Sequence, residues 1–141
     1  MALRYADIEP GTEIPRQSYQ VTRLDLVKYA GASGDFNVIH WNERAARAVG
    51  LPDVIAHGMY TMAQAARYVT EWAGGDPGAI SEFGVRFSAM VPVPDDGAGA
   101  TIEISGTVAE KLGDGKVAVD LTARAAGAKV LTRARAVVRL P

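Results

Sequence analysis

The chain has 141 residues, with 15 Lys and Arg against 16 Asp and Glu, two His and no Cys. Its length fits one domain over residues 1–141, and its near-neutral charge argues against the basic surface with which proteins bind nucleic acid. The absence of cysteine excludes disulfides, thiolate metal sites and cysteine nucleophiles. Two histidines are too few for a three-histidine metal site.

No stretch of the chain has the apolar length of a signal peptide or of a membrane span, which needs about 18 residues. We therefore expect a cytoplasmic protein that does not bind membranes.

The first part of the chain predicts one strand followed by short helices. Ile14–Val21 is the candidate strand, and Thr22 with Asp25 three residues later is close to a capping box. The helix that begins there is expected to end at Gly31. A second helix is predicted over residues 43–49, where the sequence "ERAARAV" favours helix.

The longest predicted helix begins at Gly58 and ends at Gly74 and Gly75. Its apolar residues recur at helical intervals and occupy most of its circumference. Such a helix is expected to be buried and wrapped by another element.

Four strands with period-two alternation follow this helix. Their expected ranges are 79–93, 100–112, 116–127 and 128–141, with tight turns at "GDG" and around Gly127. One antiparallel sheet of about five strands, curled around the long helix, satisfies this order and gives an α+β fold. A ferredoxin-like domain would need a helix between the later strands, where only turns occur. Because an open sheet has edges, we expect pairing with a second copy or a related chain.

Asp35 and His40 are candidates for an acid–base pair. On a helix this spacing would place them on different faces, but the glycines and serine before Asp35 indicate a loop, where the two side chains can converge. A carboxylate and an imidazole on one site can hold a water and move its protons. Asn37 would support their geometry. The alternative is ordinary turn chemistry, with Asp35 capping amides and His40 bonded to a carbonyl.

The second histidine, His57, directly precedes the long helix and is either a helix cap or part of a site. In the second interpretation, the unpaired N–H groups at the helix start bind a developing oxyanion, and Gly58 lets it approach closely. Met59 and Met62, with His57, are candidates for contacts with substrate. The small residues of the same helix are candidates for an apolar tunnel: Ala63, Ala65 and Ala66.

The stretch "YAGASGDFNVIH" followed by "WNERAA" resembles the hydratase 2 motif of MaoC-like proteins, which include mycobacterial (3R)-hydroxyacyl-ACP dehydratases. "AHGM" falls where that family begins its central helix, and residues 85–97 resemble the segment that follows it. The resemblance covers essentially the whole chain. Val38 departs from the motif, which usually has proline there. We expect this to loosen the loop without removing a functional group.

The resemblance implies a hot-dog fold, association of two hot dogs, and reversible addition of water to a trans-2-enoyl thioester to give the (3R)-hydroxyacyl product. It implies Asp35 and His40 as the catalytic pair, Asn37 as their support and the Gly58 N–H as the oxyanion donor. Neither a metal nor another cofactor is expected. The substrate is expected to be an acyl-ACP in fatty-acid elongation. Candidate contacts for that acidic carrier are Arg44, Arg47, Arg67 and Arg86.

Three alternatives use the same fold. An (R)-specific enoyl-CoA hydratase acting on short chains would carry the same motif. A non-catalytic hot-dog subunit would need none of Asp35, Asn37 and His40, and a thioesterase would give no reason for the spacing of this motif.

Overall fold

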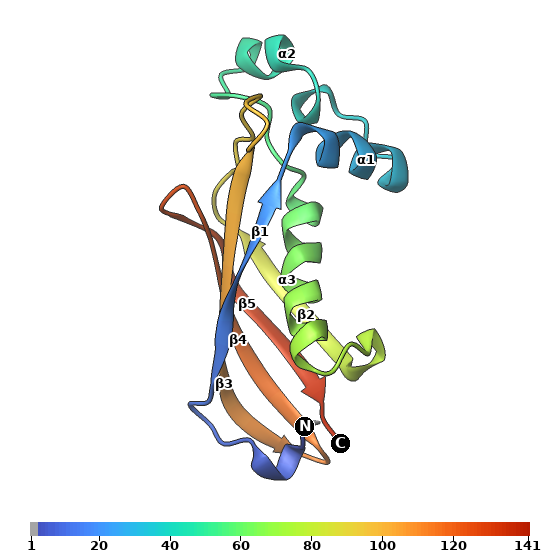
Figure 1. The fold of residues 1–141 in the computed structure, drawn as a ribbon, viewed down its shortest axis with the longest axis vertical. Helices are drawn as coiled ribbons and strands as arrows, with labels where there is room; N and C mark the ends of the chain where they lie inside the picture. Colours follow the sequence, from blue (N-terminus) through green and yellow to red (C-terminus); the bar gives the residue numbers. More distant parts are fainter. Residues whose placement is uncertain (1–2) are drawn as a thin grey trace.

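A computed structural model, which describes residues 3–141, consists of one five-stranded antiparallel sheet with a long helix, α3, packed against it (Figure 1). The strand order is β1-β3-β4-β5-β2, so β1 and β2 are the edges. This α+β, hot-dog architecture confirms the predicted fold class. The strands are β1 (Glu13–Val21), β2 (Ile80–Phe87), β3 (Ala100–Gly113), β4 (Lys116–Ala125) and β5 (Ala128–Arg139).

The three central strands form a meander through two-residue turns. Asp114 and Gly115 join β3 to β4 with φ of 52° and 74°, and Ala126 and Gly127 join β4 to β5 with φ of 49° and 78°. Two consecutive positive φ values are typical of a type I′ turn, whose twist matches that of the strands. Both predicted turns are therefore confirmed.

Helix α3 (Gly58–Trp72) has the predicted bounds but not the predicted burial. Its buried residues are Thr61, Ala65, Tyr68 and Val69, whereas Met59 is 56% exposed. Burial around most of the circumference is wrong for the single chain, because one curled sheet covers only one side of a helix. Within residues 3–141, none of the helices is long and apolar enough to cross a membrane.

Between β1 and α3 the chain forms α1 (Arg23–Ser33), the short 3-10 helix η2 (Val38–His40) and α2 (Glu43–Ala48), which lie together at one end of the sheet (Figure 1). We call residues 22–57 the cap segment. The predicted capping box is present, since Thr22 and Asp25 each bind the other's backbone N–H. Helix α1 continues past the predicted end at Gly31, because the residue in the left-handed conformation is Gly34, with φ of 77°.

The predicted strand over residues 79–93 is wrong beyond Phe87. Pro92 and Pro94 have no N–H to donate to a sheet, and residues 88–94 leave it as a loop. This loop pairs instead with the end of the cap segment, since Ala56 N–H donates to the Val91 carbonyl at 2.9 Å and Val93 N–H to the Val54 carbonyl at 2.9 Å.

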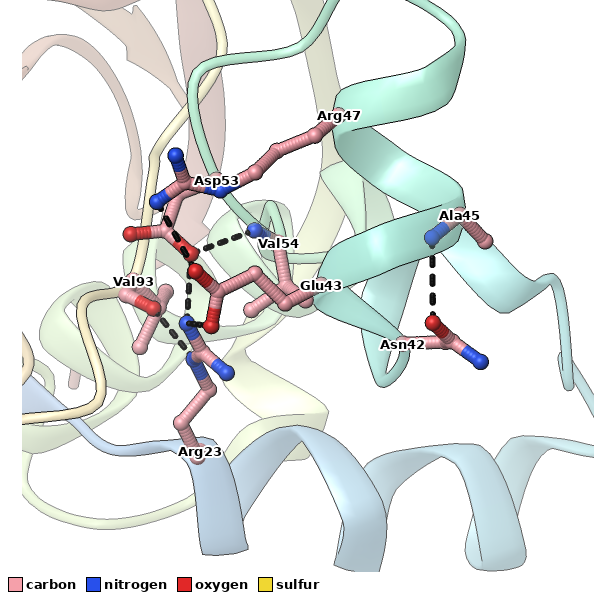
Figure 2. A network of polar contacts seen from close by, with 8 residues as sticks. All are labelled: Arg23, Asn42, Glu43, Ala45, Arg47, Asp53, Val54 and Val93. Carbon is pink, nitrogen blue, oxygen red and sulfur yellow. Dashed lines mark hydrogen bonds and ion pairs between the residues drawn. The ribbon is translucent and has the colours of Figure 1, made fainter.

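Arg23 connects the cap segment to this loop (Figure 2). Its Nε donates to the Val93 carbonyl at 2.5 Å, and its Nη2 forms ion pairs with Asp53 and, at 3.4 Å, with Glu43. Asp53 also accepts the Val54 N–H at 2.9 Å. Only 21% of the Arg23 side chain and 18% of the Asp53 side chain are exposed, so this ion pair is largely shielded from water. The network connects α1 to α2, to the end of the cap segment at Asp53 and to the loop of residues 88–94.

Candidate active site

The structure brings Asp35 and His40 together in the loop between α1 and α2. Asp35 follows the Gly34 that ends α1, and His40 is the last residue of η2. The His40 Nε2 and Asp35 Oδ2 atoms are 3.9 Å apart. The Asp35 side chain is 52% exposed and that of His40 only 9% exposed, so the pair lies at the border between solvent and core.

Asn37 holds the backbone of this loop. Its N–H donates to Asp35 Oδ1 at 3.2 Å, its Oδ1 accepts the Ile39 N–H at 3.2 Å, and its carbonyl accepts the His40 N–H at 3.1 Å. These three hydrogen bonds connect Asn37 to Asp35, Ile39 and His40 within the loop. Val38, at the motif's proline position, is the first residue of η2, where proline is also favoured.

His40 has a defined tautomer. Its Nδ1 lies 2.7 Å from the Ile55 carbonyl, which can only accept, so Nδ1 carries the proton and the Nε2 lone pair faces Asp35. Burial lowers the pKa of His40; the Ile55 carbonyl opposes this, His57 adds to the lowering, and the Asp35 carboxylate again opposes it. The net direction is down, which favours the neutral ring at neutral pH.

His57 occupies the N-cap position of α3 but is not a surface residue. Its side chain makes no capping hydrogen bond, and the residue is 1% exposed. Its ring is stacked on that of His40, with centroids 3.8 Å apart and planes at 22°, and its Nε2 lies 3.1 Å from the Asp35 carbonyl oxygen. The residue therefore stands at the cap position that the first interpretation predicted, although its side chain does not cap the helix. Apart from the presence of a second histidine, no feature of the sequence indicates this stacking.

A cavity of about 420 Å³ opens beside His40. Gly58 and Thr61 line it from α3, and the loop after β2 supplies much of its wall. That part of the wall was missed because residues 88–93 were expected to be strand. Neither the substrate-contact candidates Met59, Met62 and His57 nor the three tunnel alanines belong to the lining. The remaining lining residues are Ile55, Ala56, Phe87, Ser88, Ala89, Met90, Val91 and Val130.

Gly58 places the start of α3 at this cavity. The first hydrogen bonds of the helix are donated by Tyr60 and Thr61 to the His57 carbonyl, at 3.0 and 3.3 Å. The preceding N–H groups, including that of Gly58, have no partner within the helix, as at any helix start. A Cβ on Gly58 would lie 3.2 Å from the Phe87 ring. The missing side chain thus lets the ring pack directly against the helix start.

The Asp35, His40 and His57 ligand atoms lie within 4.8 Å of one another, a spacing that a metal ion could in principle use. However, the two rings are stacked with planes at 22°, so their lone pairs lie in two nearly parallel planes, an arrangement that does not favour two ligands converging on one ion. His57 Nε2 is also committed to the Asp35 carbonyl. The arrangement fits a bound water better than tetrahedral metal coordination.

The fold and the site together define a hot-dog domain with a carboxylate–imidazole pair whose histidine lines a largely apolar cavity. The chain belongs to the MaoC-like domain family, whose model matches residues 7–125.

A curated relative, 3-hydroxyacyl-thioester dehydratase X of Mycobacterium tuberculosis, is 36% identical over 86 residues. The match covers 61% of this chain and 29% of the relative, so this chain corresponds to only part of that protein.

Solved structures agree with the family assignment. A MaoC-like dehydratase is 40% identical, with a TM-score of 0.94 over 99% of this chain and 43% of its own. The unliganded R-hydratase of Pseudomonas aeruginosa is 25% identical, with a TM-score of 0.86 over 99% of this chain and 86% of its own. The ChsH1–ChsH2 complex of M. tuberculosis is also 25% identical, with a TM-score of 0.80 over 94% of this chain and 98% of the matched chain.

Proposed function

We propose that this chain catalyses the reversible addition of water to a trans-2-enoyl thioester, giving the (3R)-hydroxyacyl thioester. The observation that carries the proposal is the 3.9 Å approach of Asp35 to His40 Nε2, with His40 also lining the apolar cavity. The names of the dehydratase and R-hydratase relatives support the same chemistry.

In the hydration direction, a water between Asp35 and His40 Nε2 attacks the β-carbon while the pair removes one of its protons. The electrons of the double bond move toward the thioester carbonyl oxygen, and the Gly58 N–H donates a hydrogen bond to that oxygen. The pair then returns the proton to the α-carbon. One H and one OH are added, and Asp35 and His40 end as they began. Dehydration follows the same steps in reverse.

The tautomer of His40 suits this role. With Nδ1–H bound to Ile55, the neutral ring presents a basic Nε2 to the water, and Asp35 stabilises the imidazolium that forms. Because the two groups interact, their apparent pKa values belong to the pair, and a bell-shaped dependence of rate on pH is expected.

We propose an acyl-ACP of fatty-acid elongation as the preferred substrate, as the motif resemblance implies; the name of the dehydratase relative supports a 3-hydroxyacyl thioester. Two of the four arginines considered for the carrier are less suited to it. Arg47 and Arg67 each pair at 2.8 Å with a glutamate four residues away, Glu43 and Glu71. Arg44 and Arg86, both exposed, are the better candidates.

A short-chain (R)-specific enoyl-CoA hydratase is the second candidate, because the R-hydratase structure matches over nearly the whole of both chains. The active assembly is proposed to be a homodimer or a heterodimer with a related hot-dog subunit. The two exposed sheet edges and the similarity to a chain of the ChsH1–ChsH2 complex support this. In the third candidate, the chain is the non-catalytic subunit of such a pair.

The test is hydration of crotonyl-CoA, of a long-chain trans-2-enoyl-CoA and of the matching enoyl-ACP by the purified chain, followed by loss of the enoyl-thioester absorbance and by chiral analysis. A (3R) product with preference for the ACP-bound long chain supports the dehydratase. Preference for crotonyl-CoA supports the CoA hydratase. If the chain is inactive alone, the assay is repeated with a related hot-dog subunit. Inactivity of that complex, or activity that survives Asp35→Asn, would contradict catalysis by this chain.

A further inference from the structure

His57 is the most enclosed polar side chain of the site. It precedes Gly58 at the start of α3 and is 1% exposed. Its ring contacts two others: that of His40, stacked at 3.8 Å, and that of Tyr29, with centroids 4.7 Å apart. The proton steps described above do not use this buried imidazole.

The hydrogen bonding of His57 is unequal at its two nitrogens. Nε2 lies 3.1 Å from the Asp35 carbonyl oxygen, which only accepts, so Nε2 carries the proton. Nδ1 is buried and has no hydrogen-bond partner among the residues that the structure describes. An unpaired buried polar atom costs free energy, so a phenyl or aliphatic side chain would be the more stable filling if packing were the only role.

We propose that His57 is a positioning residue for the acid–base pair, whose ring orients His40 by stacking and whose Nε2–H fixes the backbone of Asp35. It does not line the cavity, whereas His40 and Gly58 do. Because His57 contacts both residues, it sets the separation between the Asp35 carboxylate and His40 Nε2. Misplacement of reacting groups by about 1 Å lowers a rate by about 100-fold, so this support acts on the chemical step.

Two substitutions separate the two contacts. His57→Phe keeps a flat ring beneath His40 and removes the N–H that holds Asp35. His57→Gln keeps a side-chain N–H at a similar reach and removes the stacked ring. The matched control is Tyr68→Phe: Tyr68 is a buried residue of the same helix whose hydroxyl donates to the Ile14 carbonyl at 3.0 Å, away from the site.

In the hydration assay, which rests on the proposed function, both His57 variants are expected to lower kcat at least 10-fold with KM within about 2-fold. Tyr68→Phe is expected to lower thermal stability and leave kcat unchanged. If the His57 variants behave like Tyr68→Phe, with only stability reduced, the positioning role is wrong.

A second readout needs no activity. Each His57 variant retains a single histidine, so the NMR titration of His40 is unambiguous. Burial is the main cause that lowers the pKa of His40; of the titratable groups, His57 adds to the lowering through its charge and Asp35 opposes it. We expect that pKa to rise in His57→Gln, where the ring is lost, and to stay unchanged in Tyr68→Phe. An unchanged His40 titration in His57→Gln would overturn the proposal.

The wild-type protein provides a test if the variants do not fold. Long-range ¹H–¹⁵N correlation spectra report which nitrogen of each histidine carries the proton. The expected pattern is Nδ1–H for His40 and Nε2–H for His57, and Nδ1–H for His57 would overturn the proposal. Since this result does not depend on turnover, a failure of the proposed function and a failure of the positioning role are distinguishable.

Discussion

Replacing Asp35 by asparagine is the most direct test of the acid–base pair, because it removes a charge and changes little else. The Oδ1 of Asp35 accepts the Asn37 N–H at 3.2 Å, and an amide oxygen can accept the same bond. The loop is therefore expected to keep its conformation in Asp35→Asn. The interaction that is lost joins Asp35 Oδ2 to His40 Nε2 across 3.9 Å.

The size of the effect follows from this distance. Two unit charges 3.9 Å apart interact by about 1 kcal/mol in water and about 4 kcal/mol at an effective dielectric constant of about 20. Half of the Asp35 side chain is exposed, so the smaller figure applies when His40 becomes protonated during the reaction. Loss of proton transfer itself lowers rates by about 100- to 10,000-fold. We expect kcat for crotonyl-CoA hydration to fall at least about 100-fold.

The matched control is Asp76→Asn. Asp76 is also exposed and its Oδ1 accepts the N–H two residues later, that of Gly78, at 2.8 Å, but it lies outside the site. Both variants should unfold at the wild-type temperature, and only Asp35→Asn should lose activity. If Asp35→Asn keeps more than about a tenth of the wild-type kcat, the carboxylate does not take part in proton transfer as proposed.

Three further predictions concern pH, the helix start and the cap segment. The pKa of His40 is lowered on folding, so its contribution to stability is present above about pH 6.5 and is lost as the pH falls toward the folded-state pKa. Urea unfolding measured across this pH range should show the loss of stability. The loss should be smaller in His40→Gln. Gly58→Ala places a Cβ 3.2 Å from the Phe87 ring and should lower kcat. Gly31→Ala places a Cβ in open space and should leave kcat unchanged. Arg23→Met should lower the free energy of unfolding by about 2 kcal/mol, whereas Arg135→Met, at an exposed position, should lower it by less than about 1 kcal/mol. Denaturant unfolding measures both values. Equal effects would contradict the structural role of the ion-pair network around Arg23.

Much of the fold is predictable from local signals. The alternation in the last three strands and the two-residue turns at Gly115 and Gly127 define a meander without any tertiary information. The capping box of Thr22 and Asp25 likewise marks the start of α1 from the sequence alone.

The wrong sequence-based predictions concern segments whose structure depends on tertiary packing. Residues 88–93 alternate like a strand, but two prolines and the contact with the cap segment take them out of the sheet. The apolar circumference of α3 gives no indication of which side the sheet leaves uncovered. The end of α1 depended on which of two nearby glycines adopts the left-handed conformation, and Gly34 does so.

The candidate site was predictable in part. Asp35 and His40 stand out by residue type and spacing, and their convergence in a loop is found in the structure. The stacking of His57 under His40 joins residues from separate elements and leaves no periodic pattern in the sequence. The same holds for the cavity wall, which Phe87 and the loop after it form only once β2 has paired with β5.

The strand order also has a consequence for how the protein folds. The β3–β4–β5 meander is made of short-range contacts, whereas β1 and β2 occupy opposite edges and are connected through residues 22–79. Contacts close in sequence form fastest, since little chain entropy is lost in making them. We therefore expect the meander to form early and the edges, which carry the connecting segment with Asp35 and His40, to dock late. During refolding, circular dichroism should recover before the proposed hydratase activity, which would appear only at the last folding step.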